Sequence, residues 1–239
     1  MQRYRAARRD RGLAVLEGFH ALKHALRFGA QLVEAVASDR EELERLAAEL
    51  APDLAGSLAQ RVTPVEADVL AQMAPHAPRT GVISIARRPV VDLAAVLADE
   101  REAPVVLLED PRSMGNMGAC VRVAAAADAA AVLTTGSNDP WHPEALRGAA
   151  GLHFALPVAP LAEIPASDRP LVAIDPEGES SDLEALSSRS ILAFGTERYG
   201  LSEALLERAD ARLAIPMREG VSSLNLATAV AAVLFSRRL

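Results

Sequence analysis

The chain has 239 residues, of which 50% are hydrophobic and only 3% aromatic. A chain of this length and apolar content buries one large core or two modest ones, which excludes an intrinsically disordered protein. The formal net charge of −7 excludes a surface that is basic all over, so any binding of nucleic acid depends on a local patch.

The start of the chain is basic, but Glu17, His20 and Lys23 interrupt the apolar stretch that a signal peptide needs. No apolar run reaches the roughly 18 residues that a membrane-spanning helix requires. We therefore expect a soluble cytoplasmic protein without a membrane partner. The single Cys120 excludes an internal disulfide, and His and Cys residues are too scattered to predict a metal site.

The first 89 residues alternate short helical and strand-like segments, which predicts a small α/β unit. The spacing of apolar residues predicts a helix over residues 13–28, ended by Gly29. The other expected elements are strands over 32–37, 61–63 and within 77–89, and helices over 41–50 and 67–73. Residues 90–103 are predicted to be a connector, helical from 92 to 99.

Basic residues concentrate at the start of the chain. Residues 1–30 carry seven Lys or Arg and two acidic residues, a local charge of +5. This pattern is typical either of a solvated or frayed terminus or of a patch that contacts phosphates.

From residue 104 the chain alternates strands and helices. The expected strands are 105–108, 131–135, 171–174, 191–194 and 212–215, and the expected helices are 119–127, 143–149, 183–186, 203–208 and 224–237. Continuous apolar strands between helices indicate an α/β fold whose parallel sheet is covered on both faces.

Three loops rich in Gly, Asn, Ser and Pro follow predicted strands, at residues 110–122, 194–202 and 215–225. The carboxyl ends of parallel strands are where such sheets build ligand sites. The chain has no dinucleotide-binding glycine motif, phosphate-binding P-loop or nucleophile elbow. The loops therefore favour a neutral or zwitterionic cofactor held by backbone groups.

The first loop contains Asn116 and, six residues later, Arg122. If the helix begins near Met117, Asn116 lies at its N-cap and could simply satisfy free amide groups. Arg122 lies in an otherwise apolar helix, and because arginine is seldom buried alone, a phosphate or carboxylate partner is expected.

The second and third loops add further polar candidates. Gly195 and Gly200 permit close backbone approach and positive φ, with the carboxylate of Glu197 between them. The last helix is expected to start near Ser223. Ser223 and Asn225 have either a ligand role or a local one, in which Ser222 or Ser223 caps the helix and Asn225 bonds to a nearby carbonyl.

The order and spacing of these three loops resemble the SpoU/TrmH family of S-adenosylmethionine-dependent RNA 2′-O-methyltransferases, closely over residues 104–239 and weakly before them. The resemblance implies a SPOUT methyltransferase domain with a trefoil knot over 104–239, a linker over 90–103, and a small ribosomal-protein-like RNA-binding domain over 1–89. It also implies a homodimer formed through the C-terminal domain. In that dimer the apolar residues of the last helix pack against the second subunit: Leu226, Val230, Val233 and Leu234.

The resemblance also implies roles for single residues. The implied catalytic residues are Asn116, Arg122, Glu197, Ser223 and Asn225. The implied S-adenosylmethionine-binding residues are Ala193, Phe194, Gly195, Gly200, Ile215, Pro216, Met217, Ser223 and Leu224. Contacts to RNA phosphates are expected from Arg8, Arg9 and Arg11. One departure from the family pattern is Ser113, which stands where many members carry Asn.

The implied reaction is methyl transfer to a ribose 2′-hydroxyl of RNA, with ribosomal RNA favoured over transfer RNA. The alternatives are a non-catalytic RNA-binding or assembly factor, a base-directed RNA methyltransferase and a small-molecule methyltransferase. Trp141, His142 and Arg147 either touch RNA or serve packing and capping.

Overall fold

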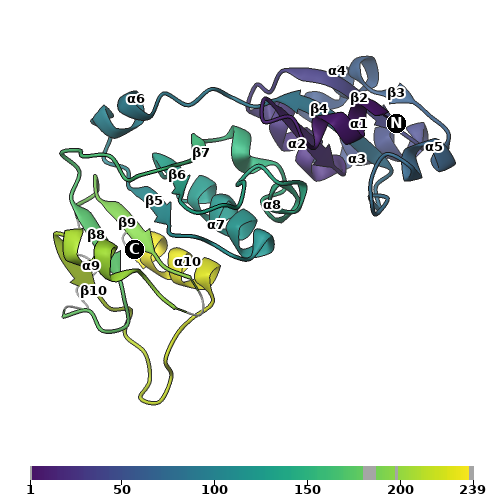
Figure 1. Cartoon of the computed structure of the whole chain (residues 1–239). Helices are drawn as coiled ribbons and strands as arrows, with labels where there is room; N and C mark the ends of the chain where they lie inside the picture. Colours follow the sequence, from purple (N-terminus) through teal and green to yellow (C-terminus); the bar gives the residue numbers. More distant parts are fainter. Residues whose placement is uncertain (1, 180–186, 197–198, 237–239) are drawn as a thin grey trace. The chain divides into compact units, whose positions relative to one another are not determined.

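The computed structural model of the chain describes residues 2–179, 187–196 and 199–236, which fold into two compact units (Figure 1). The N-terminal unit contains residues 1–90 and 141–155, and the C-terminal unit contains residues 91–140 and 156–239. The sequence pattern places residues 141–155 among the later strands and helices, whereas in the structure they pack with the N-terminal unit.

The N-terminal unit is built on a sheet with the strand order β1-β4-β2-β3. Strands β1 (Leu13–Glu17) and β2 (Leu32–Ala37) run antiparallel to β4 (Val82–Arg87), and β3 (Thr63–Pro64) runs parallel to β2. The helices of this unit are α1 (Gln2–Ala7), α2 (Phe19–Arg27), α3 (Arg40–Leu50), α4 (Ala55–Arg61), α5 (Ala67–Ala71), α8 (Pro143–Gly148) and the 3₁₀ turns Pro52–Leu54 and Leu152–Phe154.

Both faces of this sheet are covered. Ala35 and Ala37 of β2 pack in one hydrophobic cluster with α2, α3 and α4, while Val36 packs in another with α1 and α5. Successive residues of a strand point to opposite faces, so the two clusters lie on opposite sides of the sheet. The N-terminal unit thus has helices on both faces of its sheet.

The predicted helix over residues 13–28 is wrong in its first part. Residues 13–17 form β1, and α2 begins only at Phe19, after Gly18 with φ of 103°. Ala14, Val15 and Leu16 are all buried, because β1 is covered on both faces. A short continuous apolar run of this kind cannot be told from a buried helix by periodicity alone.

Residues 141–155 pack against β1 and α2 through specific contacts. Trp141 is buried against the ring of Phe154, with the ring centroids 5.2 Å apart. His142 caps α8 by accepting a hydrogen bond from the amide of Glu144, and Arg147 forms an ion pair with Glu17. Each of these three residues therefore has a structural contact: Trp141 packs in the core, His142 caps a helix and Arg147 forms an ion pair. The sequence alone allowed either this kind of role or contact with RNA.

Two further contacts hold this segment to α2. His24 Nδ1 donates a hydrogen bond to the carbonyl of Ala150 at 2.8 Å, and burial lowers the pKa of His24. Gly151 has φ of 78°, and a Cβ there would overlap the backbone of Ala21. Only glycine permits this close approach.

The C-terminal unit has six parallel strands in the order β10-β8-β9-β5-β6-β7, which confirms the predicted α/β fold with a parallel sheet. The strands are β5 (Val105–Leu108), β6 (Ala131–Thr134), β7 (Val158–Pro160), β8 (Leu171–Ile174), β9 (Ile191–Phe194) and β10 (Ala211–Leu213). The helices are α6 (Leu93–Ala98), α7 (Met114–Ala126), α9 (Glu203–Arg208) and α10 (Leu226–Ser236). Strand β7 is not predicted by the sequence pattern, and the expected helix over 183–186 lies outside the described residues.

The strand order changes direction between β5 and β9. From β5 the chain proceeds outward to β6 and β7, then continues on the other side with β8, and β9 returns next to β5. Such a switch point opens a crevice at the carboxyl ends of the two central strands. The loops after β5 and β9 therefore become neighbours.

Helix α10 packs on α7 within the chain (Figure 1). The expectation that its apolar residues pack against a second subunit is wrong for the four that were named, Leu226, Val230, Val233 and Leu234, which are all buried in the single chain. A helix that is apolar nearly all round does not reveal from its sequence which face meets the core.

The connector before β5 is held by Arg169, which is only 3% exposed. Its guanidinium donates hydrogen bonds to the carbonyls of Leu97, Asp99 and Ala103 at 2.6–3.0 Å. These bonds satisfy carbonyl groups at and beyond the end of α6, which have no partner within that short helix. In the described part of the chain, no helix has the length and apolar character needed to cross a membrane.

Candidate active site

A pocket of about 330 Å³ lies at the carboxyl ends of β8 and β9. Its lining residues are Ile174, Asp175, Pro176, Phe194, Gly195, Thr196, Gly200, Ile215, Met217, Ser222, Ser223, Leu224, Leu226 and Ala229. The set includes seven of the nine residues that the resemblance assigned to the cofactor; Ala193 and Pro216 are not among the lining residues. The volume falls in the range of small-molecule sites.

The turn after β9 forms one wall of this pocket. Thr196 and Gly200 exchange two backbone hydrogen bonds of 3.0 Å, and Gly200 has φ of 65°. Gly195 packs so closely on the turn that a Cβ there would overlap the carbonyl group of Gly200. Gly195 is thus required by close packing, and the positive φ of Gly200 favours glycine. Glu197, the carboxylate predicted for this turn, lies outside the described residues.

A second wall comes from residues 214–225, which form a long extended loop between β10 and α10 (Figure 1). Helix α10 begins at Leu226 rather than near Ser223. The N-cap is Asn225, whose Oδ1 accepts hydrogen bonds from the amides of Ala227 and Thr228 at 3.0 and 3.4 Å. Ser223 is left outside the helix and lines the pocket.

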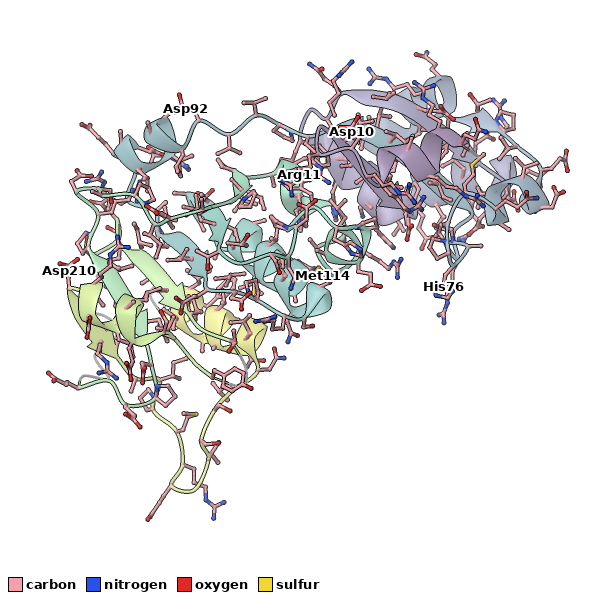
Figure 2. All side chains as sticks on the ribbon, in the orientation of Figure 1. Asp10, Arg11, His76, Asp92, Met114 and Asp210 are labelled. Carbon is pink, nitrogen blue, oxygen red and sulfur yellow. The ribbon has the colours of Figure 1, made fainter. Side chains whose placement is uncertain are left out.

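The first loop meets the third through two amide side chains. Helix α7 begins at Met114, labelled in Figure 2, and its N-cap is Ser113, whose Oγ accepts a hydrogen bond from the amide of Asn116. The alternative reading of Asn116 as the N-cap does not hold, since Ser113 takes that position. The Oδ1 of Asn116 instead accepts a hydrogen bond from Asn225 Nδ2 at 3.1 Å. Two predicted catalytic residues, 109 positions apart, are thus brought together.

Arg122 lies further along α7, with its side chain exposed. The expected phosphate or carboxylate partner is not found within the described part of the chain, where no ion pair involves Arg122. Because the guanidinium carries five donors and a permanent charge, this position suits an external phosphate or carboxylate.

The part of the chain that contains the three loops matches a known protein family. Residues 103–235 match the model of the SpoU rRNA Methylase family. The chain belongs to this family. The membership predicted from the three loops is confirmed.

Relatives of this SpoU family chain resemble it over most of its length. It is 36% identical to an uncharacterized tRNA/rRNA methyltransferase of Mycobacterium bovis, over 81% of this chain and 71% of that protein. It is 27% identical to the 23S rRNA (adenosine(1067)-2'-O)-methyltransferase of Streptomyces azureus, over 93% of this chain and 85% of that protein. The solved AdoMet-bound rRNA methyltransferase of Sinorhizobium meliloti superposes with a TM-score of 0.76 at 26% identity, covering 99% of this chain and 93% of that chain.

Two acidic residues at strand ends of the SpoU domain were not predicted from the sequence as site residues. Asp175, after β8, lines the pocket, and its carboxylate lies 3.5 Å from the guanidinium of Arg212. Glu109, after β5, accepts two hydrogen bonds from Ser202. Their only signal in the sequence is their place directly after a buried strand, at the edge where ligand sites form.

The predicted RNA-contacting arginines of this SpoU chain differ in their surroundings. Arg8 is half-buried and donates hydrogen bonds to Glu17 at 2.7 Å and to the carbonyl of Met73 at 2.6 Å. Arg9 and Arg11 are exposed, and Arg11 is labelled in Figure 2. The contacts of Arg8 stabilise the fold, which leaves Arg9 and Arg11 as the better placed pair for phosphates.

Proposed function

We propose that the chain transfers the methyl group of S-adenosylmethionine to a ribose 2′-hydroxyl of RNA, with ribosomal RNA favoured over transfer RNA. The observation that carries this proposal is the meeting of the three loops at one edge of the sheet, where Asn116 bonds to Asn225 beside the pocket. The ribose 2′-oxygen is named for the related Streptomyces azureus enzyme.

The pocket fits this cofactor in its chemistry. Its described lining is mostly apolar, with the hydroxyls of Thr196, Ser222 and Ser223, and its charged group is the carboxylate of Asp175. Such a lining suits an adenosine and a cation, whereas a phosphate-bearing cofactor would call for basic residues. When bound, S-adenosylmethionine supplies an activated sulfonium methyl group. Phe194, Gly195, Gly200, Ile215, Met217, Ser223 and Leu224 would hold it, with Ala193 and Pro216 supporting the same segments.

The chain's own residues would orient the acceptor hydroxyl. The guanidinium of Arg122 would bind the phosphate next to the ribose and stabilise the negative charge that develops on the 2′-oxygen. It cannot act as a base, because arginine stays protonated in proteins. The proton would pass to the phosphate, water or Glu197. Asn116, Asn225 and Ser223 would position the ribose at the pocket mouth.

The finer architecture belongs to the same proposal. We propose a trefoil knot in which the chain after β10 passes through a loop before α10 packs on α7, and a cytoplasmic homodimer formed through the C-terminal unit. Membership of the SpoU family supports the former, and the exposed Phe235 of α10, with 40% of its surface accessible, supports the latter. Residues 1–89 would bind the RNA, and residues 90–103 would link them to the methyltransferase domain.

The proposal is tested by labelled methyl transfer from S-adenosylmethionine to ribosomal and transfer RNA from cells lacking the protein, followed by nucleoside mass spectrometry. A 2′-O-methylnucleoside in one RNA class is the expected product. A base-methylated product would replace the ribose assignment by the base-directed one. Absence of transfer, with RNA binding retained, would favour a non-catalytic binding factor.

Replacing Arg122 by Lys is expected to lower turnover about 100-fold, because an ammonium cannot reproduce the two-pronged guanidinium contact. The dissociation constant of S-adenosylmethionine should stay unchanged. Single-turnover methyl transfer and calorimetry measure the two quantities. Arg101→Lys, at another exposed arginine, is the matched control. Near-normal turnover in Arg122→Lys would rule out bidentate positioning.

Charge reversal of the exposed pair, Arg9→Glu with Arg11→Glu, is expected to weaken RNA binding. Each lost phosphate contact should flatten the plot of log affinity against log salt by about 0.7 to 0.9. Filter binding at several salt concentrations measures this slope. Arg40→Glu with Arg45→Glu, at two exposed arginines of α3, makes the same change in net charge and is the control. If the double variant and the control behave alike, the basic start is only a solvated terminus.

A further inference from the structure

Glu109 forms hydrogen bonds to the residues on both sides of the turn that forms one wall of the pocket. The backbone amide of Glu109 donates a hydrogen bond to the carbonyl of Phe194, 2.9 Å away, directly before the turn. Its carboxylate accepts hydrogen bonds from the amide and the hydroxyl of Ser202, both 2.7 Å long, directly after the turn. Both ends of residues 195–201 are therefore attached to the end of β5.

The switch in strand order makes this attachment possible. Strands β5 and β9 are neighbours in register, with Leu108 opposite Phe194. Glu109 continues β5 by one residue and reaches Ser202 across 93 positions of sequence. Ser202 in turn caps α9 by accepting a hydrogen bond from the amide of Leu205. The carboxylate thus holds the point at which the turn becomes a helix.

The contact requires a carboxylate in particular. Ser202 presents two donors, its N–H and its O–H, and each meets a different oxygen of Glu109. A glutamine offers one acceptor oxygen, and its NH₂ group would face a donor. The half-buried Glu109 is not itself among the lining residues, whereas Gly195, Thr196 and Gly200 of the bracketed turn are.

We propose that Glu109 is a positioning residue that keeps Gly195, Thr196 and Gly200 in the arrangement that binds S-adenosylmethionine. The inference rests on the proposed function, because it takes the pocket as the cofactor site. Glu109 also begins the loop that leads to Ser113 and Asn116. The same residue therefore links the cofactor wall to the segment that would position the ribose.

The test is the binding of S-adenosylmethionine and of S-adenosylhomocysteine, by calorimetry, to Glu109→Gln, Ser202→Ala and the double variant. Glu109→Gln is expected to weaken both ligands about tenfold, since it disturbs the shape of the wall and not a charge in the pocket. Ser202→Ala loses one of the two bonds and should weaken them less. Because both changes act on one contact, the double variant should bind like Glu109→Gln.

Hydrogen exchange of the amides in the turn supplies a second readout and should become faster in Glu109→Gln. Glu207→Gln, at an exposed position of α9, is the matched control and should bind normally. Unchanged affinity in Glu109→Gln, or additive losses in the double variant, would overturn the inference. Binding is measured without RNA, so the comparison stands whichever RNA, if any, the chain methylates.

Discussion

A Gly195→Ala variant is expected to bind S-adenosylmethionine about 100-fold more weakly while keeping its overall fold. The added Cβ would overlap the carbonyl of Gly200 and the amide of Leu201. These are backbone atoms, which cannot swing aside as the end of a flexible side chain can. The turn would have to open, and with it the pocket wall that Gly195, Thr196 and Gly200 form.

Alanine substitutions at two other glycines serve as comparisons, with smaller expected effects. Gly200→Ala meets no atom within 4 Å and carries only the cost of its φ of 65°, about 1 kcal/mol, so its affinity should fall less than tenfold. Gly56→Ala, in α4 with open space around it, should bind normally. Calorimetry measures the affinities, and far-UV circular dichroism checks the fold. Equal affinities for Gly195→Ala and the wild type would show that the turn relaxes without disturbing the pocket.

A Glu17→Ala variant is expected to lower the free energy of unfolding by about 3 kcal/mol. The Glu17 side chain is 2% exposed and accepts hydrogen bonds from Arg8 and Arg147. Its removal leaves two arginines without their buried partner. The expected loss lies at the lower end of the range for a broken buried pair, because the side chain of Arg147 is half exposed and can turn to solvent.

Urea unfolding followed by circular dichroism measures this loss. The control is Glu44→Ala, which removes an exposed ion pair with Arg40 on α3 and should cost at most about 0.5 kcal/mol. High salt should reduce the small effect of Glu44→Ala and leave most of the effect of Glu17→Ala, since buried pairs are screened less. Similar losses in the two variants would contradict a special role for the buried carboxylate.

The central strands of the C-terminal unit were predictable because each is marked by a continuous apolar run in its own sequence. Strands β5, β8 and β9 have the predicted bounds, and every residue in them is buried. A parallel sheet covered on both faces requires continuous apolar runs, which stand out between helices. The short strand β7 carries Pro160 and only one buried residue, so it lacks this pattern.

The cofactor wall was predictable for a related reason. Gly195 and Gly200 follow one predicted strand and Pro216 follows another, each beside polar residues. Glycine and proline in such places indicate that the backbone turns sharply at the end of the strand. Gly195 and Gly200 meet this requirement in the structure, through close packing and positive φ respectively. Their assignment to a cofactor is a prediction from the family resemblance, and the Gly195 variant tests it.

The residues that cap the two helices were not predictable from the sequence, because several candidates lie within a few positions. Ser113 and Asn116 are both good N-cap residues three positions apart, as are Ser222, Ser223 and Asn225 at the last helix. In the structure Ser113 and Asn225 take the cap positions. Which residue caps depends on the direction from which the chain enters the helix, and that direction is set by distant segments.

The sequence by itself determined the central strands of the C-terminal unit, the sharp turns and the family, because each depends on neighbouring residues: apolar runs, glycines at strand ends and the spacing within loops. Only the tertiary structure decided that Glu109 meets Ser202, that Asn116 meets Asn225, that Glu17 pairs with Arg147 and that α10 buries its apolar face on α7. Each of these contacts joins residues about 90 to 130 positions apart. Their partners follow from strand order and helix packing, which local periodicity does not encode.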